Sequence, residues 1–270
     1  MAAAALEFSK VTLIFDDVVG LENLSFRVEA GESLVVLGVT GSGKSVLLKL
    51  SLGLYKPDGG QIYLFGEQVS GIHEADLLGL RRRVGMVFQE GALFDSLTVA
   101  DNVAYPLLNQ EGAAPPGADV EERVREALRF VELEHAIDKL PSELSGGMRR
   151  RVAIARAIVN RPPLVLYDSP TAGLDPITAH TIMSLILKER DTAGATSVVV
   201  THRLQDGHLL SKFRYDAARG EVVAAHGSSD GGSRTQVLVL QKGRQVFFGP
   251  QDELEKQQDP YLRKFVLKSQ

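Results

Sequence analysis

The sequence predicts an α/β fold whose core is a mostly parallel sheet. The first observation is a short apolar run, Leu34 to Val39, which ends in glycines and precedes an apolar stretch suited to a buried helix. Two later runs, Pro163 to Tyr167 and Thr196 to Val200, alternate with helical patterns, as the strands of a buried parallel sheet do. Polar residues follow both runs, among them Asp168 and His202. Such positions form the usual ligand edge of a parallel sheet.

Segments of a different kind surround this predicted core. Residues 6–15 (LEFSKVTLIF) and 60–66 (GQIYLFG) have strand-like composition and predict an antiparallel side sheet. After a loop rich in Gly and Pro at residues 109–119, apolar residues recur at helical spacing between Glu121 and Ala136. We therefore expect a helical subdomain at about residues 90–160.

The C-terminal third departs from this alternation. Residues 207–236 are predicted to be an irregular insertion, either a regulatory or partner-binding flap or a neutral surface loop. Residues 237–270 are expected to hold a hairpin and then a helix that places Leu262, Phe265 and Val266 on one face. That face packs on the chain itself or contacts a partner.

Composition excludes several classes of function. The 270 residues are 44% hydrophobic and 24% charged, as in soluble globular proteins, and we expect one domain over residues 1–270. The net charge of -4 argues against nucleic acid as a partner, and the lack of cysteine excludes disulfide, iron-sulfur and thiol chemistry. The basic runs Arg81–Arg83 and Arg149–Arg151 are assigned no nucleic-acid role. Neither a secretory signal nor a run of membrane-spanning length is found, which favours the cytosol.

Residues 38–45, GVTGSGKS, match the pattern GxxxxGK[ST] between a predicted strand and a predicted helix, which is the context of a phosphate-binding loop. Glycines let backbone N–H groups converge on phosphate oxygens, and the helix N-terminus adds its positive dipole. Lys44 is expected to reach the terminal phosphates, while Ser45 and Asp168 are expected to hold Mg²⁺. The candidate nucleotide-binding residues are Gly38, Val39, Thr40, Gly41, Ser42, Gly43, Lys44, Ser45 and Val46.

A second motif is more specific. The run LSGGMRRRVAIARA, residues 144–157, is followed by Asp168 and then by AGLD at residues 172–175. With these motifs in this order, the sequence resembles the ATPase subunits of ABC transporters over essentially the whole chain to about His202. The resemblance implies a P-loop NTPase fold of ABC type, in which an antiparallel β side sheet and a helical subdomain accompany the mostly parallel core sheet.

The resemblance also implies roles for further residues. ATP on the phosphate loop is completed by a second copy of the chain, so a homodimer forms on ATP binding. Gln89 is the Q-loop glutamine, which contacts Mg²⁺ and links the site to a membrane partner, and His202 hydrogen-bonds the γ-phosphate. Asp175 marks the D-loop. Phe15 lies where the family places an aromatic that stacks on adenine, and its alternative is a plain core phenylalanine. The residues that the second copy contributes are Ser145, Gly146 and Gly147.

Within the family, two segments are similar to ATPases of the Mla and Mce type. These segments are Phe88 to Leu108 and the ending DPYLRKF. The similarity implies transport of phospholipid or another lipid in the bacterial envelope. The implied partners are an integral-membrane permease, docked through a groove near Gln89 to Leu108, and an Mce-type substrate-binding subunit. The implied location is the cytoplasmic face of the inner membrane, as a peripheral subunit.

The sequence departs from the family at the position of the catalytic base. The family follows its aspartate with a glutamate that polarises the attacking water, and Ser169 stands there in this chain. A serine hydroxyl is not a base near neutral pH, and a positioned general base contributes roughly 10² to 10⁴ in rate, so slow hydrolysis is expected. Either Ser169 orients water while charge stabilisation supplies the rate, or Glu90 or His202 substitutes, or ATP is bound and barely hydrolysed. The candidate catalytic residues are Gln89, Ser169 and His202.

Two other functions stay open. One is a soluble ABC protein of DNA repair, translation or iron-sulfur assembly, which the single ATPase domain, the lack of a coiled-coil insertion and the acidic balance disfavour. The other is an ATP-gated binding module without hydrolysis, in which Ser169 marks lost catalysis. Phosphate release in the presence of a permease separates the second from a transport ATPase.

Overall fold

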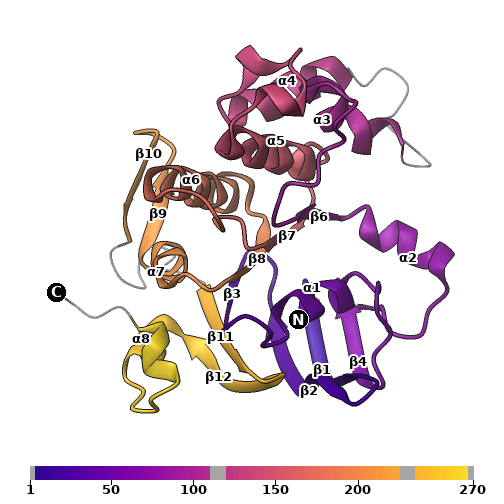
Figure 1. The fold of residues 1–270 in the computed structure, drawn as a ribbon, viewed down its shortest axis with the longest axis vertical. Coiled ribbons are helices and arrows are strands. Elements are labelled where there is room, and N and C mark those ends of the chain that lie inside the picture. The colour runs from indigo at the N-terminus through magenta and orange to yellow at the C-terminus, as the bar shows by residue number, and fades with distance from the viewer. Residues whose placement is uncertain (1–3, 110–119, 226–234, 267–270) are drawn as a thin grey trace.

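A computed structural model describes residues 4–109, 120–225 and 235–266. Within these ranges the chain forms a six-stranded sheet, a four-stranded sheet, a two-stranded hairpin and a helical subdomain (Figure 1). Three predicted features lie wholly or partly outside the described residues. They are the loop at 109–119, the insertion at 207–236 in its part 226–234, and the last residues, 267–270, of the C-terminal helix.

The six-stranded sheet has the strand order β12-β11-β3-β8-β7-β6. Its neighbouring strands are parallel except at one edge, where β12 runs antiparallel to β11. The predicted mostly parallel core sheet is thereby confirmed. Its strands are β3 (Ser33–Leu37), β6 (Val84–Val87), β7 (Leu164–Asp168), β8 (Thr196–Thr201), β11 (Thr235–Gln241) and β12 (Arg244–Pro250).

Strand β3 lies between two hydrophobic cores, because alternate side chains of a strand point to opposite faces of the sheet. Leu34 and Val36 belong to the core that α1 and the four-stranded sheet complete. Val35 and Leu37 belong to the core that α5 and α6 complete. Since both faces are covered, the strand is apolar without alternation, as predicted. The helices named here are α1 (Lys44–Ser51), α5 (Gly146–Ile158) and α6 (Pro176–Ala193).

The four-stranded sheet has the order β2-β1-β4-β5, with antiparallel neighbours throughout. This confirms the antiparallel side sheet predicted from residues 6–15 and 60–66. Phe8 and Phe26 of this sheet belong to the core that covers α1, and their rings stack with centroids 4.7 Å apart. Its strands are β1 (Leu6–Phe15), β2 (Val18–Val28), β4 (Gly59–Leu64) and β5 (Glu67–Gln68).

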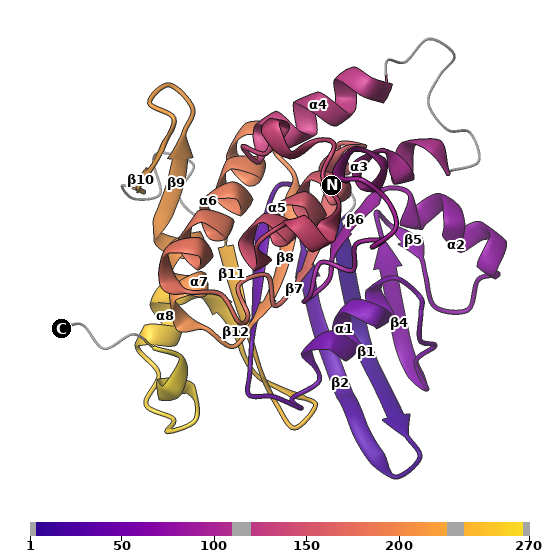
Figure 2. The same cartoon turned by 45° about the horizontal axis from the view of Figure 1, so that its top comes forward.

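The helical subdomain lies at the opposite end of the molecule from the antiparallel sheet (Figure 2). Helix α3 begins with a capping box, in which Thr98 and Asp101 satisfy each other's backbone N–H groups. Val124 and Leu128 are buried one helical turn apart on α4, as their spacing predicts. The elements of this region are α3 (Val99–Leu108), α4 (Val120–Phe130), the 3₁₀ helices η1 (Glu134–Ala136) and η2 (Pro141–Glu143), and α5. Helix α2 (Glu74–Arg81) instead buries Leu77 and Leu80 in the core that the four-stranded sheet completes.

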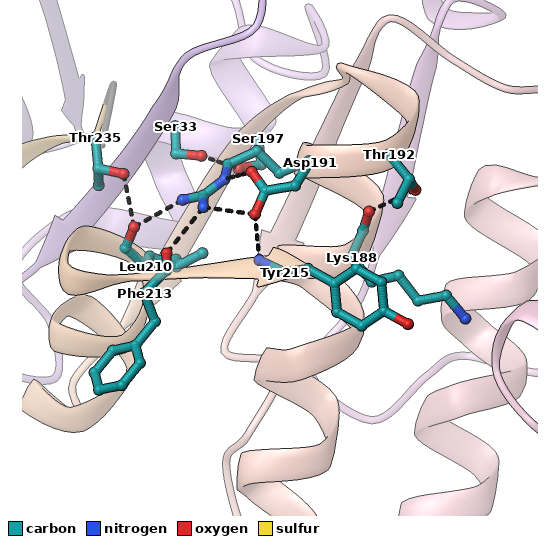
Figure 3. Close-up of polar contacts among 10 residues, drawn as sticks. Ser33, Lys188, Asp191, Thr192, Ser197, Leu210, Phe213, Tyr215 and Thr235 are labelled. Atoms are coloured by element: carbon teal, nitrogen blue, oxygen red, sulfur yellow. Dashed lines mark hydrogen bonds and ion pairs between the residues drawn. The ribbon is translucent and has the colours of Figure 1, made fainter. Parts of the chain in front are cut away.

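Part of the insertion predicted to be irregular is instead regular. Helix α7 (Leu204–Lys212) is followed by the antiparallel strands β9 (Phe213–Asp216) and β10 (Glu221–Ala224), which lie beside α6 (Figures 1 and 2). Arg190 of α6 donates hydrogen bonds to the carbonyls of Leu210 and Phe213, at 2.7 and 3.0 Å (Figure 3). Asp191 accepts one from the Tyr215 amide at 2.7 Å. These long-range contacts order the hairpin, and they leave no periodic signal in the sequence.

The C-terminal segment ends in α8 (Gln251–Glu255) and the 3₁₀ helix η4 (Leu262–Phe265). Leu262 and Phe265 are buried in the core of the chain itself, and Val266 packs partly against it. This confirms the first of the two expectations for that face, although the described helix is a single 3₁₀ turn. In the described parts of the chain, every helix is too short or too polar to cross a membrane.

Candidate functional site

The phosphate loop connects β3 to α1 through backbone conformations that glycine supports. Gly43 precedes the helix in a left-handed conformation, with φ at 103°. A Cβ atom there would lie 2.6 Å from the Gly20 carbonyl oxygen, so the loop also needs a residue without a side chain. Ser42 is buried, and its hydroxyl oxygen is among the buried side-chain atoms without a hydrogen-bond partner in the described residues.

Lys44 folds back over this loop. Its Nζ donates hydrogen bonds to the carbonyl oxygens of Gly38 and Val39, at 2.8 and 2.9 Å. Burial lowers the pKa of Lys44, and the charge of Asp168 acts in the opposite direction. The loop lysine and the aspartate at the end of β7 therefore lie close enough for their charges to interact.

The residues after β7 adopt an unusual conformation. Ser169 has φ at 48°, a left-handed conformation that a non-glycine residue rarely adopts. Its amide donates to the Val200 carbonyl at 2.9 Å, which ties the segment to the neighbouring strand β8. Its hydroxyl donates to Asp168 Oδ1 at 3.2 Å. The side chain at the expected position of the base is thus engaged with the aspartate.

Gln89 and His202 are exposed where β6 and β8 end, at the same sheet edge as Asp168. Arg150 of α5, although only 6% exposed, joins two of these strand ends. Its Nη1 lies 3.3 Å from the Phe88 carbonyl oxygen and 3.4 Å from that of Ser169. Burial lowers the pKa of Arg150, while the charges of Glu90 and Asp168 raise it. Sequence reasoning considered this arginine only as part of a basic run.

Asp206 was missed altogether. It is 1% exposed on α7, and its Oδ2 accepts hydrogen bonds from the hydroxyls of Thr171 at 2.6 Å and Thr201 at 2.7 Å. Burial raises the pKa of Asp206, and the two hydroxyl donors lower it. The available sequence signal was an acidic residue in the first turns of the helix that follows β8, at a position facing the strand ends.

The LSGGM segment lies at the start of α5 rather than at the phosphate loop. Ser145 caps this helix by accepting a hydrogen bond from the Met148 amide at 3.2 Å, and both Ser145 and Gly146 are exposed. A Cβ atom at Gly147 would lie 2.5 Å from Thr178 Cγ2, so α5 begins close against α6. Helices α1 and α5 pack on opposite faces of the core sheet. One copy of the chain therefore does not bring these two predicted parts of the site together.

Two remaining predicted positions lie at the surface. Phe15, at the end of β1, is 38% exposed and packs edge-to-face on Tyr55, with ring centroids 5.2 Å apart. The alternative that Phe15 is a plain core residue is wrong, because a core side chain would be covered. Asp175 caps α6 by accepting hydrogen bonds from the amides of Ile177 and Thr178, both at 3.0 Å, and hydrogen bonding by the Thr178 side chain and by these amides lowers its pKa.

Comparison with known proteins identifies the family of the chain. Residues 21–172 match the model of the ABC transporter family. The methionine import ATP-binding protein MetN of Corynebacterium diphtheriae is 39% identical over 208 residues, which are 76% of this chain and 60% of that protein. The intermembrane phospholipid transport system ATP-binding protein MlaF of Haemophilus influenzae is 36% identical over 243 residues, 90% of this chain and 89% of that protein. The chain thus spans less of the methionine import protein than of the phospholipid transport protein.

Solved structures give the same fold. A dimeric structure of the ATP-binding cassette MJ0796 in a post-hydrolysis state, bound to ADP and phosphate, has a TM-score of 0.73 at 31% identity, covering 91% of this chain and 98% of that chain. The structure of cbiO1 from Clostridium perfringens, part of the ABC transporter complex cbiONQ, has a TM-score of 0.75 at 27% identity, covering 93% and 90%. The predicted ABC-type α/β fold is confirmed.

Proposed function

The chain belongs to the ABC transporter family, and from this premise we propose that it is an ATP-binding subunit that couples ATP hydrolysis to transport. The observation that carries the proposal is the placement of Lys44 across the phosphate loop, where the charge of Asp168 acts on its ammonium group. Residues 1–270 then act as one ATPase domain. Measuring nucleotide binding to the full chain and to Lys44→Ala tests the first step.

In the proposed complex, the amides of residues 38–46 surround the phosphates of ATP. Lys44 exchanges its two carbonyl partners for phosphate oxygens, which are stronger acceptors for an ammonium group. The exposed ring of Phe15 stacks on the adenine base. Replacing Phe15 by Ala is expected to weaken ATP binding more than binding of inorganic triphosphate, because only ATP carries a ring to stack on.

The residues at the sheet edge fit Mg²⁺. Ser45, Gln89 and Asp168 offer hydroxyl, amide and carboxylate oxygens, the donors that Mg²⁺ prefers, and each is at least partly exposed. When bound, the ion neutralises charge on the phosphates. His202, at the end of β8, hydrogen-bonds the γ-phosphate in this arrangement. Asp168→Asn is expected to weaken the binding of Mg²⁺-ATP without a matching loss for ATP in EDTA.

We propose that ATP joins two copies of the chain. Because α1 and α5 pack on opposite faces of the core sheet, Ser145, Gly146 and Gly147 serve a nucleotide held by the partner, with the exposed start of α5 directed at phosphate. The test is the molar mass of the native chain in the presence of a non-hydrolysable ATP analogue, which is expected to be that of a dimer. Ser145→Arg is expected to stay monomeric while it still binds nucleotide. Gln245→Arg, at an exposed position of β12, is the matched control and is expected to dimerise.

Hydrolysis is proposed to be slow. Ser169 has no basic group, and its hydroxyl donates to Asp168. Glu90 is the proposed substitute for the base, because it is a carboxylate that follows β6 and its charge, like that of Asp168, acts on Arg150. We expect Ser169→Glu to raise the rate and Glu90→Gln to lower it. If neither the native complex nor Ser169→Glu releases phosphate, the proposal of ATP hydrolysis is wrong. The function is then that of an ATP-gated binding module without hydrolysis.

A groove beside the Gln89 segment is proposed to receive the permease. A cavity of about 290 Å³ between the core sheet and α3 is lined in part by Phe88, Phe94 and Tyr105. These side chains are 43%, 41% and 39% exposed, an apolar cluster that suits a helix of a membrane subunit. Tyr105→Glu is expected to abolish co-purification with the membrane complex. Val246→Glu, at a similarly exposed position on β12, is expected to leave it intact.

The proposed cargo is a phospholipid or another lipid of the bacterial envelope. The phospholipid transport relative is matched over nearly its whole length, and this supports the proposal over methionine, the cargo named for the other relatives. The proposal places the chain as a peripheral subunit at the cytoplasmic face of the inner membrane, with an Mce-type substrate-binding subunit in the complex. Mass spectrometry of the purified complex is expected to find bound lipid. ATP-driven uptake of methionine into vesicles that contain the complex would contradict this cargo.

A further inference from the structure

The buried carboxylate of Asp206 joins two segments that each carry a candidate catalytic group. Thr171 belongs to the segment after β7, two residues beyond Ser169, and Thr201 ends β8, immediately before His202. Both hydroxyls donate to the same oxygen, Asp206 Oδ2, at 2.6 and 2.7 Å. A shift of either segment relative to the other breaks one of these bonds.

Arg203 completes the connection. Its amide donates to Thr201 Oγ1 at 3.0 Å, and its Nη1 donates to the Thr171 carbonyl at 3.4 Å. Its Nε lies 3.9 Å from Asp206 Oδ1. The backbone on both sides of His202 is therefore held by groups that Asp206 positions. Ser169 is attached to the same strand by its amide bond to the Val200 carbonyl, at 2.9 Å.

The electrostatics favour a fixed arrangement. Desolvation of the 1%-exposed carboxylate is unfavourable, and it raises the pKa of Asp206. The hydroxyls of Thr171 and Thr201 and the charges of Arg203 and His202 act in the opposite direction. Because a buried carboxylate that loses one donor has no solvent to replace it, the two short hydroxyl bonds tend to persist together.

We propose that Asp206 is a positioning residue for ATP hydrolysis, which fixes His202 relative to the Ser169 segment so that both address the γ-phosphate. The inference rests on the proposed ATPase function. Asp206 itself touches neither nucleotide nor water in this account. In a chain whose ordinary base is replaced by serine, the rate depends on how well the remaining groups are placed.

The first test is the steady-state kinetics of Asp206→Asn in the full-length chain within its membrane complex. The amide keeps the size of the carboxylate but removes its negative charge, and it places an NH2 donor either against the two hydroxyl donors or against Arg203. We expect kcat to fall by at least about tenfold, because small displacements of reacting groups have large effects on rate. The KM for ATP is expected to stay within about twofold, because the phosphate loop is untouched.

The controls separate positioning from a general loss of packing. Thr235 is also buried, and its hydroxyl donates to the Leu210 carbonyl at 2.9 Å (Figure 3). It begins β11 and pairs with Ser33 at the start of β3, at the opposite end of these strands from the site. Thr235→Val is expected to leave kcat within about twofold of native. Thr201→Val removes one donor and is the second variant, which is expected to lower kcat by itself and so tests the inference alone if Asp206→Asn does not fold. Where both variants fold, their effects on kcat are expected to be non-additive.

A second readout does not depend on activity. Hydrogen exchange of the Arg203 amide and of the amides at 172–174 is expected to accelerate in Asp206→Asn, while exchange in β11 stays native. If the native complex releases no more phosphate than Lys44→Ala, the proposed function fails and this exchange measurement decides the positioning role alone. Unchanged exchange in both segments overturns the inference. With an active native complex, a kcat of Asp206→Asn within about twofold of native also overturns it.

Discussion

Replacement of Glu189 by glutamine is expected to stabilise the protein at alkaline pH and to have little effect at acid pH. Glu189 is 6% exposed on α6, at a cavity of about 250 Å³ between this helix, α4 and α5. Burial raises its pKa from 4.5 to about 7, and the charge of Lys188 only partly offsets this. The folded state therefore binds a proton more tightly than the unfolded state does.

The sign and size of the effect follow from this difference. Below pH 4.5 the carboxyl is neutral in both states, and its contribution to stability is fully present. As the pH rises toward 7 the unfolded state ionises freely while the folded state resists, so stability falls. At about 1.4 kcal/mol per pKa unit, the loss reaches about 3 kcal/mol and is complete above pH 7. Glutamine keeps the shape of the neutral acid and avoids this loss.

Urea unfolding at pH 5 and pH 8 measures the prediction. Glu189→Gln is expected to gain about 3 kcal/mol over native at pH 8 and less than about 1 kcal/mol at pH 5. Glu126→Gln is the matched control, because Glu126 borders the same cavity but is exposed and paired with Arg161. It is expected to change stability by less than about 1 kcal/mol at either pH. An equal gain for Glu189→Gln at both values of pH would refute the burial argument.

Three further variants test local parts of the structure. Gly43→Ala is expected to destabilise the phosphate loop by about 1 to 3 kcal/mol and to abolish ATP binding in a titration, because φ is 103° and the added Cβ meets the Gly20 carbonyl. Thr98→Ala removes the cap of α3 and is expected to lower the free energy of unfolding by about 1 kcal/mol in urea, whereas Thr98→Ser retains most of it. Arg190→Lys loses the paired bonds to Leu210 and Phe213, and faster hydrogen exchange in residues 213–224 is expected. Native exchange there would show that the arginine is not the anchor.

The sequence was most informative where a repeated pattern and a local motif agree. The apolar run of β3, the glycines of the phosphate loop and the start of α1 lie within twenty residues, so their placement needs only strand and helix periodicity. The β9–β10 hairpin was predicted to be irregular. In the structure, Arg190 and Asp191 of α6 hold its first strand through hydrogen bonds. Such contacts join residues too distant in sequence to form a pattern.

Single buried polar residues were the hardest to predict. Arg150 and Asp206 connect strand ends that are adjacent only in the folded sheet, so the local sequence of Arg150 does not distinguish it from a surface residue, and that of Asp206 offers only its place in the first turn after β8. The replacement at Ser169 was visible in the sequence, but its left-handed backbone and its bond to Asp168 were not. These features arise from the turn that leaves β7 and from the packing of β8 beside it.

The central claim is that the Lys44 loop and the residues around Asp168 hydrolyse ATP. The most direct measurement is phosphate release by the chain in its membrane complex, compared with the same complex carrying Lys44→Ala. We expect slow but clear release by the native complex and a loss of at least about tenfold in the variant, because the ammonium group neutralises charge on the terminal phosphates. Equal rates in the two complexes would contradict the account.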